Sequence, residues 1–179
     1  MKIYTRKGDD GTTGLLFGGR VRKDGPAPTA YGAVDEAQAA IGAVRAECER
    51  GSELEVMLVG LERDLWVLMA EMATDPANRS KLTVGKNLVS DDMVTALEAS
   101  IDALSTRFDP PTEFVVPGET RIAALLDVAR TIVRRAERHA LAAAEEESFA
   151  VPYLNRLSDL LWTMARWQEG TSLPSREAQ

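Results

Sequence analysis

Apolar residues recur along this chain at the spacing of α-helices, in five separate stretches. Within each stretch, positions three or four residues apart are apolar and the positions between them are mostly polar, so each helix would turn one face to a core. The predicted helices cover residues 29–50, 53–74, 91–108, 119–147 and 149–169. On the first of them, the apolar face consists of Ala30, Val34, Ala37, Ile41 and Val44.

Between and beyond these stretches the helical pattern stops. Ser52 is a predicted N-cap, because its hydroxyl can accept a hydrogen bond from a free backbone N–H of the second helix. Residues 75–90 predict a long, mobile surface loop. Residues 112–118 are short and apolar and cannot be helical across Pro117. Residues 170–179 are predicted to form a disordered, flexible tail.

Five helices with short connections and no convincing strand predict an all-α fold. The expected architecture is an antiparallel, up-and-down five-helix bundle of the ferritin-like kind. With 179 residues the chain is most simply a single domain, residues 1–179, with a sizeable core. Residues 1–26 precede the bundle as a Gly/Thr-rich loop, called here the N-terminal arm.

Composition narrows the choice of ligands and compartment. The net charge of -7 argues against nucleic-acid binding, so an anionic ligand would need a local basic patch. The single cysteine, Cys48, cannot form an internal disulfide, which fits a reducing compartment. The sequence has no secretory signal pattern and no apolar run near the ~20 residues of a membrane span. We therefore expect a cytoplasmic protein without a membrane partner.

The N-terminal arm combines glycines with cations and hydroxyls. Gly8, Gly11 and Gly14 recur at every third residue, and Arg6 and Lys7 lie beside them. Glycine lets backbone N–H groups approach a ligand closely, and successive N–H groups in a turn can cradle an anion. The arm is not a Walker P-loop, because no Gly-Lys-Ser/Thr follows at the required spacing. It is therefore either a nucleotide-binding arm or a mobile tail.

The fourth predicted helix carries the densest group of arginines. Arg130, Arg134, Glu137 and Arg138 fall on one narrow stripe beside its apolar face, and Arg135 projects from the other edge of its polar side. Guanidinium groups bind phosphates and carboxylates through several planar donors. The stripe indicates either an anion site or a solvated helix face held by intrahelical ion pairs.

The last predicted helix has a second polar stripe, formed by Asn155, Asp159, Trp162 and Arg166. Bundles build their sites from such side chains on facing helices. A di-iron site needs paired Glu-x-x-His motifs, and His139 is the single histidine, so di-iron, zinc and Ser-His-Asp chemistry all lack support. Binding of a nucleoside triphosphate by the arm and the arginines is the chemistry that remains.

Five sequence blocks resemble the signature blocks of the PduO-type ATP:cob(I)alamin adenosyltransferases, in that family's order and over most of the chain. They are YTRKGDDGTTG (4–14), AYGAVDE (30–36), FVVPG (114–118), ARTIVRRAER (129–138) and YLNRLSDLL (153–161). The RRAER and YLNRLSD segments together are the most specific. The resemblance implies a five-helix bundle that assembles as a homotrimer with active sites between subunits.

The resemblance also implies the reaction. ATP donates its 5′-deoxyadenosyl group to the cobalt of reduced cob(I)alamin, and inorganic triphosphate leaves. Because cob(I)alamin is itself the nucleophile, the protein supplies positioning and stabilises charge on the triphosphate. Mg²⁺ is expected on the ATP phosphates, with no protein side chain assigned to it. The implied partners are a cob(II)alamin reductase and an adenosylcobalamin-dependent enzyme.

Carried over by motif position, the resemblance assigns ATP-binding residues to the arm and to two helices. From the arm they are Thr5, Arg6, Lys7, Gly8, Thr13, Gly14 and Lys23. From the helices they are Arg134, Arg135, Glu137, Arg138 and Asn155. Arg134 is expected to be the most rate-sensitive of these residues.

On the cobalamin side, the resemblance implies that Phe114 wedges under the corrin and excludes the lower axial ligand, so that cob(II)alamin is more easily reduced. From the residues alone, Phe114 could equally be a hydrophobic plug under a loop. Asp35 and Arg130 match a family ion pair that crosses the subunit interface near that site. The predicted catalytic residues are therefore Arg134, Arg130 and Phe114.

Two positions depart from the family pattern. Glu119 stands where a second glycine is common, and it could alter the loop beside Phe114 or cap the following helix. Lys7 replaces a more usual threonine and could add a phosphate contact. Two alternatives remain. One is a bundle that binds ATP or corrinoid as a non-catalytic sensor or delivery protein, and the other is an unrelated nucleotide-binding enzyme.

Overall fold

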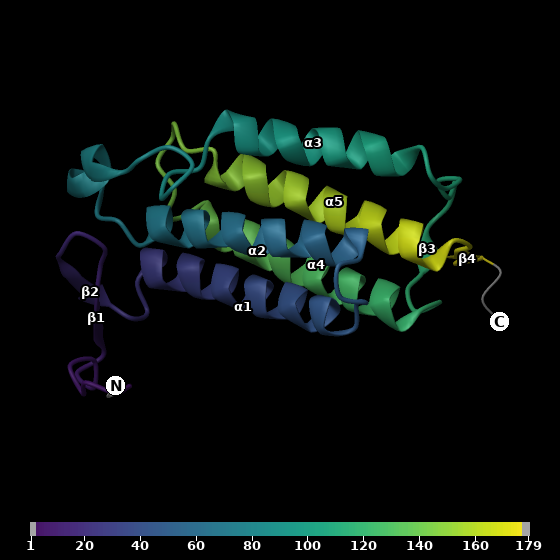
Figure 1. Ribbon diagram of the computed structural model, residues 1–179. Helices are drawn as coiled ribbons and strands as arrows, with labels where there is room; N and C mark the ends of the chain where they lie inside the picture. Colours follow the sequence, from purple (N-terminus) through teal and green to yellow (C-terminus); the bar gives the residue numbers. More distant parts are fainter. Residues whose placement is uncertain (1–2, 177–179) are drawn as a thin grey trace.

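The computed structural model describes residues 3–176, which form five long α-helices packed side by side (Figure 1). They are α1 (Pro26–Ala46), α2 (Glu53–Met72), α3 (Asp91–Ser105), α4 (Arg121–Ala140) and α5 (Ala150–Glu169). Successive helices run in opposite directions; α1 packs against α2 and α4, and α5 packs against α4 and α3. The predicted all-α, up-and-down bundle is confirmed. No helix in the described part combines the length and apolar character of a membrane span.

The helices bury their apolar faces in one shared core. The predicted face of α1, from Ala30 to Val44, is 0% exposed at all five positions. Leu65, Val133 and Leu157 are buried to the same degree on α2, α4 and α5. Full burial of a Val or Leu side chain contributes about 1.5–3 kcal/mol. These faces therefore fix which side of each helix points inward and which side carries the polar stripes.

The N-termini of two helices show the local chemistry that starts them. Ser52 caps α2 as predicted, because its hydroxyl accepts a 3.2 Å hydrogen bond from the Glu55 N–H. At α4 the cap is Thr120 rather than Glu119, through a 3.1 Å hydrogen bond from the Ala123 N–H. The helix therefore begins later than predicted, and the Glu119 carboxylate is not its cap.

Two helix boundaries lie away from their predicted places. α1 begins at Pro26, earlier than predicted, because proline is well suited to the first turn of a helix. α4 ends at Ala140 rather than near residue 147. Continuing it would bring the acidic run 145–147 to the negative end of the helix dipole, where carboxylates are unfavourable.

The loop predicted between the second and third helices is more ordered than expected. It contains a short 3-10 helix, η1 (Pro76–Lys81). The buried carboxylate of Glu71 anchors it, accepting hydrogen bonds from Arg79 Nη2 (3.0 Å) and from the Val89 N–H (2.8 Å). The same carboxylate accepts a 2.6 Å hydrogen bond from Ser148 Oγ. One buried acid thus ties this loop to the connection between α4 and α5.

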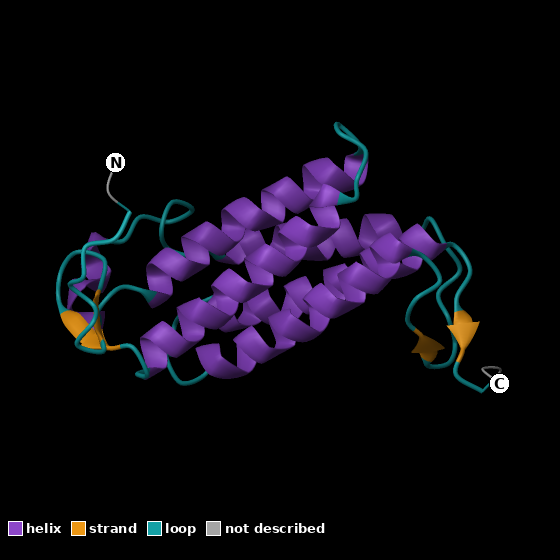
Figure 2. Cartoon of the chain, turned by 90° about the horizontal axis from the view of Figure 1, so that it is seen from below, coloured by secondary structure: helices purple, strands orange, loops and turns teal. Residues whose placement is uncertain are grey.

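The connector before α4 and the residues after α5 form a small antiparallel sheet at one end of the bundle (Figure 2). β3 (Val115–Val116) pairs with β4 (Leu173–Pro174), and the Ser175 N–H donates a 2.8 Å hydrogen bond to the Phe114 carbonyl. The prediction of a disordered tail is therefore wrong for this segment, because the connector offers its backbone hydrogen-bond partners. Residues 177–179 lie outside the described part.

The N-terminal arm forms the other small sheet. β1 (Thr12–Gly14) pairs antiparallel with β2 (Arg20–Arg22). This hairpin lies at the opposite end of the bundle from β3 and β4 (Figure 1). Strands of two or three residues carry too little alternation to be recognised in a sequence, which is why none was predicted.

Candidate functional site

The N-terminal arm is folded back on itself by Arg20 and Asp10. Arg20 Nη2 donates hydrogen bonds to the Lys7 carbonyl (2.6 Å) and to Thr12 Oγ1 (2.5 Å). Asp10 Oδ1 accepts two hydrogen bonds from Thr12, one from its hydroxyl (2.7 Å) and one from its backbone N–H (2.9 Å). These two bonds lower the pKa of Asp10. Arg6 has a φ of 61°, in the left-handed region that side chains rarely adopt. The arm is therefore a defined turn.

Gly8 and Lys23, both predicted to bind ATP, meet in this turn. A Cβ on Gly8 would lie 3.1 Å from Lys23 Nζ and 3.1 Å from the Thr12 carbonyl oxygen, so a larger residue would displace its neighbours. The Lys23 N–H donates a 2.9 Å hydrogen bond to the Gly11 carbonyl. The turn thus holds an ammonium group against a glycine backbone, which is an arrangement suited to an anion.

The other predicted residues of the arm lie around the same turn. Thr13 and Gly14 belong to β1, opposite Val21 and Arg20 of β2. Thr5 Oγ1 accepts a long, 3.4 Å hydrogen bond from the Lys7 N–H. Thr5, Arg6 and Lys7 are exposed, so their polar groups are open to a ligand.

Two of the predicted residues, Asn155 and Glu137, meet where α4 packs on α5. Asn155 Nδ2 donates a 2.9 Å hydrogen bond to Glu137 Oε1, which joins the two helices. Arg138 Nη1 turns back along α4 and donates a 2.9 Å hydrogen bond to the Arg134 carbonyl. Both arginines are exposed. The stripe predicted on α4 is thus linked to α5 through Glu137, and its Arg134 and Arg138 side chains are exposed.

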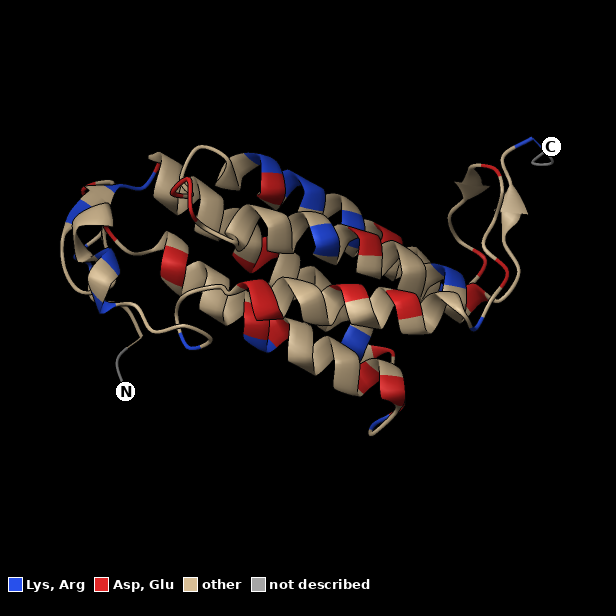
Figure 3. Ribbon diagram, turned by 90° about the horizontal axis from the view of Figure 1, so that it is seen from above, with Lys and Arg blue, Asp and Glu red and all other residues tan. Residues whose placement is uncertain are grey.

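Arg135 leaves α4 on another side. It forms an ion pair with Glu36 on α1, so in this chain it links two helices. Lys and Arg also gather around the N-terminal arm and η1 at one end of the molecule, while both signs of charge are interspersed along the helices (Figure 3). This acidic chain therefore presents its cations in local groups.

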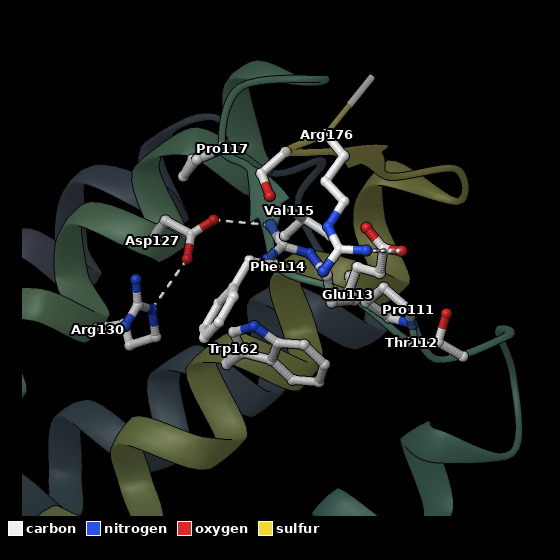
Figure 4. Close-up of a pocket in the computed structure, with 12 residues that line it drawn as sticks. Pro111, Thr112, Glu113, Phe114, Val115, Pro117, Asp127, Arg130, Trp162 and Arg176 are labelled. Atoms are coloured by element: carbon white, nitrogen blue, oxygen red, sulfur yellow. Dashed lines mark hydrogen bonds and ion pairs between the residues drawn. The ribbon is translucent and has the colours of Figure 1, made fainter. Parts of the chain in front are cut away.

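A pocket of about 780 Å³ opens at the end of the bundle where β3 and β4 lie (Figure 4). Its walls come from the connector, α4, α5 and the segment after α5. Phe114 is 89% exposed at this pocket, and Trp162 of α5 lines it as well. Arg130 contributes a half-buried guanidinium. The pocket therefore combines aromatic surface with a cation.

The floor of the pocket contains a buried ion-pair network that the sequence did not reveal. Asp127 Oδ1 accepts a 2.9 Å hydrogen bond from Arg130 Nε, and Asp127 Oδ2 accepts a 2.7 Å bond from Arg166 Nη2. Asp127 was not predicted, although it lies one helical turn before Arg130. Arg166 was assigned to a polar stripe, yet it is 1% exposed. A buried arginine needs a buried partner, and that requirement is the signal that could have identified Asp127.

Asp35 does not pair with Arg130 within the chain. It is exposed on α1, beside a hollow of about 410 Å³ lined by Leu16, Tyr31 and Trp66 among others. Arg130 instead pairs with Asp127 of its own helix. The predicted contact between Asp35 and Arg130 across a subunit interface stays a prediction.

The predicted site residues fall into separate places along the bundle. The arm lies at one end, the pocket with Phe114 lies at the other, and α4 runs along the bundle between the two ends (Figure 1). Chemically, the arm and the arginines suit a polyphosphate, whereas the pocket suits a larger ligand with apolar surface.

The class of protein that the fold and the site define is a helical bundle with a cationic arm at one end and an aromatic-lined pocket at the other. The chain superposes with a TM-score of 0.87 on a variant PduO-type ATP:corrinoid adenosyltransferase from Lactobacillus reuteri complexed with cobalamin and ATP, with 28% identity, covering 99% of this chain and 98% of that one. The family model described as Cobalamin adenosyltransferase matches residues 3–168. The chain belongs to the cobalamin adenosyltransferase family.

Two relatives with similar sequences are also corrinoid adenosyltransferases. The corrinoid adenosyltransferase of Citrobacter freundii is 40% identical over 173 residues, which cover 95% of this chain and 96% of the relative. The corrinoid adenosyltransferase PduO of Salmonella typhimurium is 38% identical over 173 residues, covering 94% of this chain but 50% of that longer protein. This chain is therefore an enzyme of the adenosyltransferase family, and it matches about half of the Salmonella protein.

Proposed function

We propose that this chain transfers the 5′-deoxyadenosyl group of ATP to the cobalt of cob(I)alamin, giving adenosylcobalamin and inorganic triphosphate. The observation that carries the proposal is the match to a corrinoid adenosyltransferase over 95% of the chain. The cobalt electron pair forms the bond to C5′ while the C5′–O bond breaks, and its electrons leave with the triphosphate. Because the substrate is the nucleophile, no protein side chain has to form a covalent intermediate.

The nucleotide half of the proposed site consists of the arm and the α4–α5 stripe. Its residues are Thr5, Arg6, Lys7, Gly8, Thr13, Gly14, Lys23, Arg134, Arg135, Glu137, Arg138 and Asn155. Support comes from the Lys23 ammonium held over the Gly8 turn and from the outward guanidinium of Arg134. Negative charge grows on the triphosphate as the C5′–O bond breaks, and cations fixed at that position lower the barrier.

Mg²⁺ is proposed to bind together with ATP, coordinated by the ATP phosphates. No group of three His, Cys, Asp or Glu side chains within residues 3–176 could hold a metal ion. Mg²⁺ commonly keeps several waters and binds through substrate phosphates together with few protein ligands.

The cobalamin half of the proposed site is the 780 Å³ pocket with Phe114 and Arg130. A phenylalanine that is 89% exposed leaves apolar surface in water, which a bound corrin would cover. The Ser175–Phe114 backbone hydrogen bond fixes the chain beside this ring. In the proposal, Phe114 occupies the lower face of the corrin and keeps an axial ligand away from cobalt.

Assembly as a homotrimer is part of the proposal. The arm and the Phe114 pocket lie at opposite ends of one chain, so a subunit arrangement would have to bring them together (Figure 1). Trp66 is 68% exposed beside Asp35, which offers apolar surface for a neighbouring subunit. Light scattering coupled to size exclusion should give three times the chain mass of 19.5 kDa. The cytoplasmic location, the reductase and the adenosylcobalamin-dependent partner stay predictions.

An anaerobic assay tests the activity. The purified chain is mixed with Mg-ATP and chemically reduced cob(I)alamin, and visible absorbance follows the loss of cob(I)alamin and the rise of light-sensitive adenosylcobalamin. The expected result is product with an equal amount of triphosphate, and no product when ATP is omitted. Tight binding of ATP or corrinoid without turnover would favour a sensor or delivery protein. The absence of both binding and turnover would overturn the proposal.

A further inference from the structure

Arg166 is the largest of the fully buried side chains in the described part, with 1% of its surface exposed in the last turn of α5. Its Nη2 donates to Asp127 Oδ2 (2.7 Å) and to Glu169 Oε2 (3.1 Å). Its Nε lies 2.5 Å from Glu169 Oε1 as an ion-pair contact that is not aligned as a hydrogen bond. The guanidinium carbon also lies 5.6 Å from the centre of the Trp162 ring. One buried cation is therefore held by two carboxylates and an aromatic face.

Asp127 divides its two oxygens between two arginines. Oδ2 faces the buried Arg166, and Oδ1 accepts the hydrogen bond from Arg130 Nε at 2.9 Å. Figure 4 shows Asp127 with a dashed line from each of its two oxygens, one of them leading to Arg130. Exposure rises along this series, from 1% for the Arg166 side chain to 6% for Asp127 and 27% for Arg130. The network thus leads from the protein interior to the wall of the pocket.

Packing alone does not account for this network. Burying charged groups costs several kcal/mol per ion before pairing is counted, and apolar side chains of similar volume often fill such a space with no loss of stability. The two guanidinium groups and the carboxylates of Asp127 and Glu169 balance in charge. Hydrogen bonds and ion pairs in such a network fix the orientation of each side chain, which apolar packing would not do.

The geometry points to Arg166 as a positioning residue: by holding Asp127 Oδ2, it fixes Asp127 so that the Arg130 guanidinium stays at the pocket wall beside Phe114. This inference rests on the proposed role of Arg130 on the cobalamin side. Without Arg166, both oxygens of Asp127 are open to Arg130, and a guanidinium readily forms a two-pronged contact with one carboxylate. Arg130 would then turn inward, and its terminal nitrogens would leave the pocket.

The consequence is specific to one substrate. The contacts of Arg166 lie on the floor of the Phe114 pocket, whereas the proposed ATP residues lie on the arm, farther along α4 and, for Asn155, near the start of α5. Loss of Arg166 should therefore weaken cobalamin binding and leave ATP binding close to its original strength. A general loosening of the bundle would weaken both.

A double-mutant cycle tests the inference. The variants Arg166→Met, Arg130→Ala and the double variant are compared with the original chain. Absorbance titration at saturating Mg-ATP gives the affinity for cob(II)alamin. Calorimetry gives the affinity for ATP. Arg166→Met should lose about tenfold in cob(II)alamin affinity, within the range of couplings between contacting residues. The double variant should lose no more than Arg130→Ala alone, and Arg166→Lys should recover part of the affinity.

Arg156 provides the matched control. It lies on the same helix and also contacts two carboxylates, Glu98 and Asp159, but at the surface and away from the pocket. Arg156→Met should keep both affinities. If Arg166→Met does not fold, as judged by its thermal unfolding curve, Asp127→Asn replaces it in the cycle. This variant keeps the side-chain size and loses the second acceptor oxygen.

The outcomes separate the inference from the proposed function. If Arg130→Ala weakens cobalamin binding while Arg166→Met or Asp127→Asn does not, the positioning role is wrong and the proposed site stands. Losses that add in the double variant would also overturn it, because Arg166 would then act independently of Arg130. If Arg130→Ala itself binds cobalamin normally, the assignment of Arg130 fails and the positioning role fails with it.

Discussion

Asn155 on α5 and Glu137 on α4 are joined by one hydrogen bond, from Asn155 Nδ2 to Glu137 Oε1 over 2.9 Å. Both side chains are partly buried, and the bond lies on the helix face that also carries Arg134 and Arg138. The amide occupies Oε1 and holds the Glu137 carboxylate toward α5, away from the guanidinium groups of its own helix. The bond therefore leaves the arginines available for a phosphate.

Asn155→Ala should raise the KM for ATP by about tenfold or more, since a hydrogen bond to a charged group is worth roughly 1.5–3 kcal/mol. Glu137 would lose its partner and turn to an arginine of its own helix. Initial rates at varied ATP and saturating cob(I)alamin give the KM. Gln168→Ala, a change at the far end of α5, is the control and should behave as the original chain. An unchanged KM would remove Asn155 from the nucleotide site.

Arg134→Ala should lower kcat by at least about a hundredfold, the scale of losing one group that stabilises transition-state charge. The bundle should stay intact, because Arg134 is exposed and its side chain supports no core contact. Single-turnover formation of adenosylcobalamin measures the rate, and circular dichroism checks the fold. Arg121→Ala removes another exposed arginine of α4 and should keep activity. Comparable activity in the two variants would contradict a role for Arg134.

Phe114→Ala should slow product formation from cob(II)alamin much more than from chemically reduced cob(I)alamin. The ring is proposed to exclude the lower axial ligand, which matters for reduction of cob(II)alamin and has no effect once cobalt is reduced. The two routes are compared with the same enzyme preparation and the same ATP concentration. Val84→Ala, at an exposed apolar residue outside the pocket, is the control. Equal slowing of both routes would rule out the wedge.

Asp64 gives a pH-dependent effect on stability. Tyr153 Oη donates a 2.9 Å hydrogen bond to Asp64 Oδ2, but burial raises the pKa of Asp64 by more than this bond lowers it. A carboxyl group whose pKa is higher in the folded chain than in the unfolded chain costs stability at neutral pH. That cost declines as the pH falls through the folded-state pKa toward the ordinary carboxyl value of about 3.9.

Asp64→Asn should therefore raise the free energy of unfolding at neutral pH, and the gain should shrink in acid. The amide oxygen can still accept the hydrogen bond from Tyr153. Urea unfolding at a series of pH values measures the difference, with Asp102→Asn as an exposed control. A gain that grows toward acid pH, or a loss at neutral pH, would show that the hydrogen bond to the carboxylate outweighs its burial.

The sequence was sufficient to predict the five helices, and its local patterns supplied the candidate site residues. A period of 3.6 residues identifies a buried face whatever the face packs against, so Val34 and Leu157 could be assigned to the core without knowing their neighbours. The glycines of the arm and the arginines of α4 are recognisable because their chemistry is local. Phe114 became a candidate site residue through the resemblance of its sequence block to the family. From the residues alone, it could equally have been a hydrophobic plug under a loop.

The features that the sequence did not predict all depend on contacts between distant residues. Helical spacing assigned Arg166 to the side of α5, but its depth is set by Asp127, 39 residues earlier in the chain. The pairing of β3 with β4 needs two segments that meet only once α4 and α5 have packed. Glu71 holds three segments together through a guanidinium, a backbone N–H and a hydroxyl, and the residues that provide them have no recognisable spacing in the sequence.

The burial of Arg166 gives the two halves of the site different responses to ionic strength. Arg134 and Lys23 face solvent, where interactions between charges are screened beyond about 8 Å at physiological salt and more strongly above it. Arg166 is shielded from counter-ions, so its hold on Asp127 changes little with added salt. Raising the salt concentration should therefore increase the KM for ATP while cobalamin affinity holds, and dissolved ions alone would distinguish the two binding sites.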